Sequence, residues 1–130
     1  MRRYSAIAAV ALLAAACGAP STNVVYSKAA SEACLVKESV RVRSVANTGD
    51  FVAESATGGA YRAVLKANDV TVSFGATLDD ADNIDQAYRR FHAKNVGIDD
   101  VLRTQGSAVM LWHMHPSDAD IAKITGCLKK

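Results

Sequence analysis

Two histidines separated by one residue are the side chains of this sequence best suited to bind a metal ion. The segment His113-x-His115-Pro116 follows a short apolar run. In a β-strand, alternate residues point to the same face, so two imidazoles at this spacing could bind one metal ion. A zinc site in a protein needs at least one further ligand from the chain. The spacing therefore makes His113 and His115 candidate metal ligands.

The His113-x-His115 pair resembles the His-x-His pair of JAMM-type zinc isopeptidases. In that family an aspartate follows the second histidine by eleven positions, whereas this chain has Gly126 there, beside Cys127. The resemblance implies a metal-binding or metal-dependent hydrolytic module that uses His113 and His115. The alternative interpretation is a pair of partly exposed histidines near the end of a strand, and we therefore expect no metal and no cofactor.

Other motifs that would indicate an enzyme are missing from the sequence. Neither Gly-x-Ser-x-Gly nor Ser-x-x-Lys occurs. Asp80-x-Asp82 lacks the ligand spacing and the glycine of a calcium loop, and it fits acidic residues at the start of a helix better. The sequence therefore favours a protein without catalytic activity.

The amino-terminal segment has the layout of a secretory signal. Arg2 and Arg3 precede an apolar run over residues 6–16 that is too short to span a membrane. Cys17 follows three alanines and precedes a glycine, which resembles the lipobox of bacterial lipoproteins, although the usual leucine three positions before the cysteine is absent. The resemblance implies lipidation of Cys17 and an exported protein that is anchored to a cell membrane on its periplasmic or extracellular face. Plain cleavage by the general signal peptidase is the alternative.

A lipidated Cys17 would leave Cys34 and Cys127 as an even pair of cysteines in an oxidising compartment. We predict that these two form a structural disulfide, with their Cα atoms within about 7 Å. A redox-active pair is the alternative, but the chain has no Cys-x-x-Cys spacing.

Length and charge limit the number of domains and the classes of partner. We predict a signal peptide over 1–16, a lipidated cysteine with a tether over 17–27, and a single domain over 28–130. Without Arg2 and Arg3 the chain would carry 13 basic and 13 acidic residues. A neutral balance of this kind removes the main driving force for non-specific nucleic-acid binding, so no nucleic-acid partner is expected.

The order of apolar patterns and turn residues predicts an α+β fold. The expected elements are a helix over 27–38, a strand near 40–45, a possible short strand over 51–55, a hairpin over 60–74 turning at 68–69, a helix after Thr77, a hairpin over 101–114 turning at 106–107, and a helix after Pro116. Two hairpin–helix units predict a two-layer sandwich, in which helices cover one face of an antiparallel sheet.

The second hairpin has two apolar faces, and only one can be covered in such a sandwich. One face holds Leu102, Thr104, Val109, Leu111 and His113, and we assign it to the helices. The other face would leave Trp112, Met110, Arg103 and Met114 open, a combination typical of interaction surfaces. The alternative is that Trp112 faces the helices. We therefore expect a cell-envelope lipoprotein that acts as a binding module for a protein or cell-wall partner.

Overall fold

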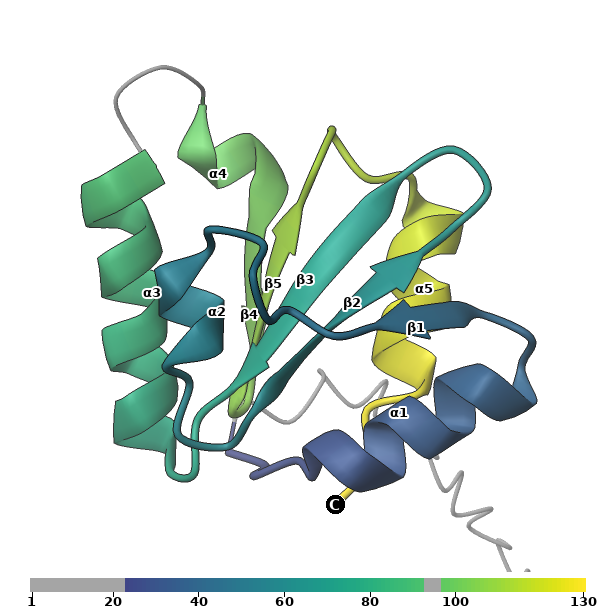
Figure 1. Cartoon of the computed structure of the whole chain (residues 1–130), viewed down its shortest axis with the longest axis horizontal. Helices are drawn as coiled ribbons and strands as arrows, with labels where there is room; N and C mark the ends of the chain where they lie inside the picture. Colours follow the sequence, from purple (N-terminus) through teal and green to yellow (C-terminus); the bar gives the residue numbers. More distant parts are fainter. Residues whose placement is uncertain (1–22, 93–96) are drawn as a thin grey trace, which may run out of the picture.

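Five antiparallel strands form one sheet with the order β1-β2-β3-β5-β4 (Figure 1). The computed structural model describes residues 23–92 and 97–130. In chain order the elements are α1 (Lys28–Lys37), β1 (Arg41–Arg43), α2 (Phe51–Glu54), β2 (Ala60–Val64), β3 (Asp69–Phe74), α3 (Leu78–His92), α4 (Ile98–Val101), β4 (Leu102–Gln105), β5 (Ala108–Trp112) and α5 (Asp118–Gly126). The predicted α+β class and the antiparallel sheet are confirmed. Within the described residues, no helix is long and apolar enough to cross a membrane.

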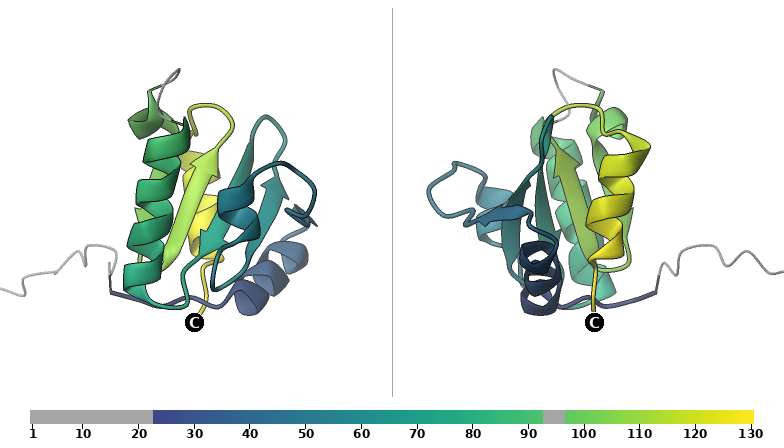
Figure 2. Two further views of the ribbon diagram at one scale, coloured as in Figure 1. Left: turned by 60° about the vertical axis from the view of Figure 1, so that its left-hand side comes forward. Right: turned by 90° about the vertical axis from the view of Figure 1, so that its right-hand side faces the viewer.

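Helices lie on both faces of the sheet. α1 and α5 cover one face, while α2 and α3 pack against the other (Figure 2). The prediction that helices cover one face only is therefore wrong. Helices cover both faces because each face of the sheet carries many apolar side chains. A single helical layer would leave the apolar side chains of one face exposed to water.

The larger core lies between the sheet and the helices α1 and α5. The register pairs Tyr61 with Val72, Val72 with Met110, and Val70 with Trp112, so these side chains share one face. All of them are buried, and Leu35 of α1 and Ile124 of α5 close over them. Burial of this apolar surface is the main stabilising contribution to the fold.

The hairpin of β2 and β3 turns earlier than the sequence predicted. Ala63 pairs with Val70, and the Leu65 amide donates to the Asn68 carbonyl at 2.8 Å, so the turn lies at 66–67 instead of 68–69. The predicted inner face is nevertheless confirmed. Moving the register by an even number of residues keeps every side chain on its own face.

The segment Phe51–Glu54 is a short helix, and the prediction of a strand there is wrong. The Asp50 carboxylate caps this helix by accepting from the Ala53 amide at 3.0 Å. Such capping favours a helical turn, and it is a local signal that the apolar pattern does not contain.

The described chain begins and ends near the same end of the strands, below the turn between β4 and β5 (Figure 1). The Ser107 amide donates to the Val24 carbonyl at 2.9 Å, and the Ser27 amide donates to the Lys129 carbonyl at 2.7 Å. Residues 24–27, which we predicted to belong to a tether, are therefore bonded to the domain. Gly106 permits this contact, because a Cβ atom at its position would lie 2.2 Å from the Val24 carbonyl oxygen.

Cys34 of α1 and Cys127 at the end of α5 are bridged, which confirms the predicted disulfide. Their Cα atoms lie 5.3 Å apart, and the bridge joins residues 93 positions apart in the sequence. Cys127 is buried in the larger core and Cys34 packs against it. The bridge therefore holds the first and the last helix on the same face of the sheet.

Candidate functional site

A cleft of about 340 Å³ opens on the sheet face that α2 and α3 cover only in part. Its floor includes Thr71 of β3 and Leu111 of β5, which are paired in the register. Val45 and Thr48, from the connection between β1 and α2, line the cleft, as do Ile98 and Val101 of α4. This volume is at the small end of the range for ligand pockets, enough for a small molecule or one side chain of a partner.

Asp50 is one of the acidic residues that line this cleft. Besides capping α2, it accepts a hydrogen bond from the Tyr88 hydroxyl at 2.9 Å. The Tyr88 side chain is buried, and its hydroxyl lies 3.4 Å from the Ser73 hydroxyl on β3. Burial raises the pKa of Tyr88, the bond with Ser73 opposes that rise, and the Asp50 charge adds to it, so Tyr88 stays a neutral donor.

An ion pair lies beside the cleft floor. Arg62 of β2 donates through both Nε and NH2 to one carboxylate oxygen of Asp69, at the start of β3. Arg62 also pairs with Thr71 in the register, which places the guanidinium next to the floor. The pair supplies both a cation and an anion to the cleft lining, and each neutralises the other.

His113 lines the cleft and is exposed. Its amide donates to the Asp69 carbonyl at 2.9 Å. The next residue, Met114, forms two backbone hydrogen bonds with the buried Asn68 side chain. Asn68 donates to the Met114 carbonyl at 3.0 Å and accepts from the Met114 amide at 3.1 Å. These bonds fix the backbone beyond β5 and thereby place His113 at the cleft.

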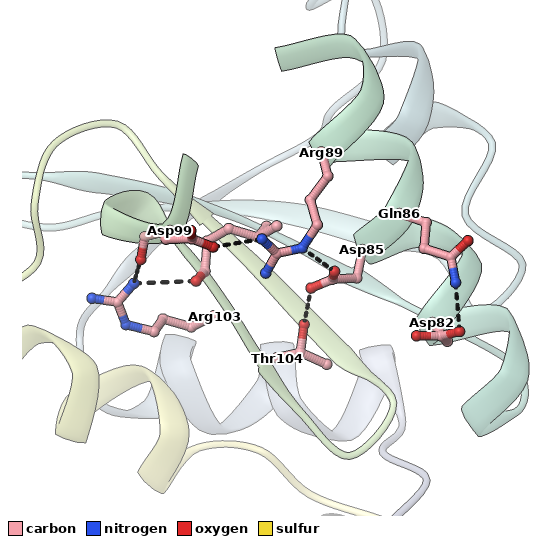
Figure 3. A network of polar contacts seen from close by, with 8 residues as sticks. Asp82, Asp85, Gln86, Arg89, Asp99, Arg103 and Thr104 are labelled. Carbon is pink, nitrogen blue, oxygen red and sulfur yellow. Dashed lines mark hydrogen bonds and ion pairs between the residues drawn. The ribbon is translucent and has the colours of Figure 1, made fainter. Parts of the chain in front are cut away.

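A polar network holds α4, which lines the cleft, to α3 and β4 (Figure 3). Arg89 of α3 pairs with Asp85 at 2.6 Å and with Asp99 of α4 at 2.5 Å. Asp85 also accepts from the Thr104 hydroxyl of β4 at 2.8 Å, and Arg103 donates to the Asp99 carbonyl at 2.9 Å. The hydrogen bonds to Asp99 and Asp85 raise the pKa of Arg89, and the network positions Ile98 and Val101 at the cleft.

The structure overturns the predicted interaction face around Trp112. Trp112 is 2% exposed, and Met110 is buried beside it in the core under α1 and α5. Arg103 is half-buried and donates to the backbone carbonyls of Asp99 in α4 and Leu102 in β4. Met114 alone of the four is exposed, at 52%. The pairing of β3 with β5 is the physical reason, because it puts Trp112 on the same face as Val70.

The two candidate metal ligands lie just beyond the end of β5, where both are exposed. His113 lines the cleft, while His115 Nδ1 lies 2.6 Å from the Asp100 carboxylate. Within 23–92 and 97–130, no group of three or more histidine, cysteine, aspartate or glutamate side chains is placed to hold a metal ion. The described chain therefore supplies no third ligand to this pair.

The predicted lipidation site, Cys17, and the predicted signal peptide over 1–16 lie outside the described residues. The same holds for most of the predicted tether, 17–27, of which the described part begins at Asn23.

A second, smaller hollow of about 260 Å³ lies between α2 and α3. Phe51 lines it, and the Phe51 ring contacts the Phe91 ring edge-on, with the ring centroids 5.1 Å apart. The two side chains are 54% and 57% exposed. The pair was not predicted, because the pattern around Phe51 indicated a strand.

Comparisons with known proteins give no match. No protein-family model, no curated protein and no solved structure matches the chain. Inference about function therefore rests on the cleft and on the amino-terminal sequence.

The cleft combines polar and apolar side chains. Hydrogen-bonding groups from separate elements line it together with aliphatic side chains, which is the usual composition of a ligand pocket. No sequence motif singled out Asp50, Arg62, Asp69 or Thr71. The signal available was that Arg62 and Thr71 share the polar face of the first hairpin, which the alternation of side chains does show.

Proposed function

We propose that this chain is an exported, lipid-anchored cell-envelope protein that binds a protein or cell-wall partner without catalysis, and that the cleft is its binding site. The observation that carries the proposal is the cleft itself, a concave and partly apolar hollow lined by side chains from several separate elements. The amino-terminal pattern that ends at Cys17 supports export and anchoring. The disulfide supports an oxidising compartment.

The position of the cleft suits a protein anchored through its amino terminus. The Val24 carbonyl is bonded to Ser107, so the described chain begins at the end of the sheet where β3 ends and β5 starts. Asp69 at the start of β3 and His113 just beyond β5 lie at the opposite end of these two strands. From Cys17 to Asn23 an extended chain spans about 20 Å at most. An anchored domain would therefore stay close to the membrane, with the cleft toward its far end.

The metal-dependent alternative, which would use His113 and His115, is not part of this proposal. It lacks a third ligand among the described residues, and His115 lies against Asp100.

Filling the cleft tests the proposal. Thr71→Trp adds a large side chain to the floor of the cleft, and aromatic residues have a high propensity for strands. Val36→Trp is the matched control, because Val36 is 60% exposed on α1, which covers the other face. After chemical cross-linking in intact cells, we expect Thr71→Trp to lose the partner that the wild-type protein and Val36→Trp both retain.

The folded state of both variants is checked by thermal denaturation before capture is compared. Equal partner capture by a folded Thr71→Trp variant would show that the cleft is not the binding site.

A further inference from the structure

Asp50 adds an acidic side chain to the lining of the cleft. Its carboxylate accepts from the Ala53 amide at 3.0 Å and from the Tyr88 hydroxyl at 2.9 Å, and both donors are neutral. Among the described residues Asp50 forms no ion pair, whereas Asp69 is paired with Arg62. A carboxylate has about four acceptor positions, so Asp50 can accept from a ligand as well.

The two neutral donors also fix the direction of this carboxylate. The Ala53 amide belongs to the first turn of α2, and Tyr88 is buried under it on α3. A carboxylate that is already oriented loses little conformational entropy when a ligand binds. Asp50 is therefore an acceptor prepared for a cationic group.

The remaining walls of the cleft are suited to an aliphatic chain. The apolar side chains among its lining residues include Val45, Ile98, Val101 and Leu111. Long cationic side chains bury their methylene groups against such surfaces and keep the charged end at a polar group. An anionic ligand would instead meet the uncompensated charge of Asp50, which opposes its entry.

We infer that the cleft takes an aliphatic chain that ends in a primary ammonium group, such as the lysine side chain of a peptide, with the ammonium group at Asp50. This inference rests on the proposed function and names the chemistry of the ligand. Both a lysine of a protein partner and a diamino acid of a cell-wall peptide carry this group.

A titration of the folded domain with three small probes tests the inference. The cationic probe is Nα-acetyl-lysine methylamide, the neutral one is Nα-acetyl-norleucine methylamide, and the anionic one is Nα-acetyl-glutamate methylamide. In ¹H–¹⁵N NMR spectra, we expect the cationic probe alone to shift the amide signals of Thr48, Thr71 and Leu111. A soluble cell-wall peptide with a diamino acid, titrated in parallel, then distinguishes the two sources by its affinity relative to the lysine probe.

Asp50→Asn isolates the charge, because asparagine is an equally good helix cap and keeps an oxygen for the Ala53 amide. We expect this variant to bind the cationic probe at least about tenfold more weakly, the usual effect of losing a hydrogen bond between charged groups. Glu54→Gln is the control, since it removes the same charge from an exposed residue of α2 and should leave the affinity unchanged.

Equal shifts by the neutral probe, or unchanged affinity in Asp50→Asn, would overturn the inference. No shift by any probe would overturn it as well. None of these results bears on the proposed function, which the Thr71→Trp cross-linking experiment tests separately. If that experiment still captured a partner through the cleft, the cleft would recognise the partner by other chemistry.

Discussion

Replacing Trp112 with alanine separates a core role from a surface role for the only tryptophan of the chain. Trp112 is 2% exposed and lies in the core formed by β3, β5, α1 and α5. Removing a buried tryptophan side chain costs about 3–5 kcal/mol through lost burial and the cavity left behind. For a domain of this size that loss lowers the melting temperature by on the order of 15 °C.

The indole nitrogen adds a finer test. Among the described residues, Trp112 Nε1 has no hydrogen-bond partner although it is buried. An unsatisfied buried donor costs about 1–3 kcal/mol, and Trp112→Phe removes it while keeping an aromatic ring. We therefore expect Trp112→Phe to lose less than about 2 kcal/mol, because the relieved penalty offsets part of the lost contact area.

Chemical denaturation monitored by circular dichroism measures both variants. Met114→Ala serves as the control, because Met114 belongs to the predicted open face and is 52% exposed. We expect this control to change the free energy of unfolding by less than about 0.5 kcal/mol. A Trp112→Ala domain as stable as the Met114→Ala domain would refute the placement of Trp112 in the core.

Three further predictions concern stability. Replacing both bridged cysteines with alanine should lower the free energy of unfolding by about 4–5 kcal/mol, because the bridge closes a long loop of the chain. Urea denaturation measures this loss, and a loss below about 1 kcal/mol would contradict the prediction. Burial raises the pKa of Tyr61 and Tyr88 above their ordinary value of 10, so the folded state holds these protons more tightly than the unfolded state. The contribution of the two tyrosines to the free energy of unfolding should therefore be complete below about pH 10 and be lost as the pH rises beyond it. In melting curves between about pH 8 and pH 11, the melting temperature of Tyr88→Phe should decrease less than that of the wild type. Gly106→Ala should lower the free energy of unfolding by about 1–3 kcal/mol, because Gly106 has a φ of +52° and the added Cβ would meet the Val24 carbonyl. The control Gly126→Ala should be neutral or stabilising in the same thermal assay, because nothing lies within 4 Å of the added Cβ.

Elements with a local signal could be predicted from the sequence. The sequence predicts helices after Thr77 and after Pro116, and both begin at a capping residue. Ser117 caps α5 by accepting from the Asp120 amide, and Thr77 caps α3 by accepting from the Asp80 amide. The β4–β5 hairpin has the predicted register, with Gln105 opposite Ala108, because Gly106 and Ser107 mark its turn. Such features depend on residues close together in the chain.

Features that depend on pairing between distant segments could not be predicted. β3 and β5 are separated in the sequence by α3, α4 and β4, so nothing local shows that Val70 lies opposite Trp112. That single pairing decides which face of the second hairpin joins the larger core. The cleft has the same origin, because Thr48, Arg62 and Leu111 come together only when the sheet is assembled.

Site-specific photo-cross-linking in intact cells tests the central claim most directly, namely that the cleft binds the partner. A photoreactive residue is placed at Thr48, which is exposed and lines the cleft, and in a separate strain at Val36 on the opposite face. The account predicts a partner adduct from position 48 that disappears when Thr71→Trp fills the cleft, and none from position 36. An adduct from position 36 alone, or an adduct at 48 that survives the filled cleft, would contradict it.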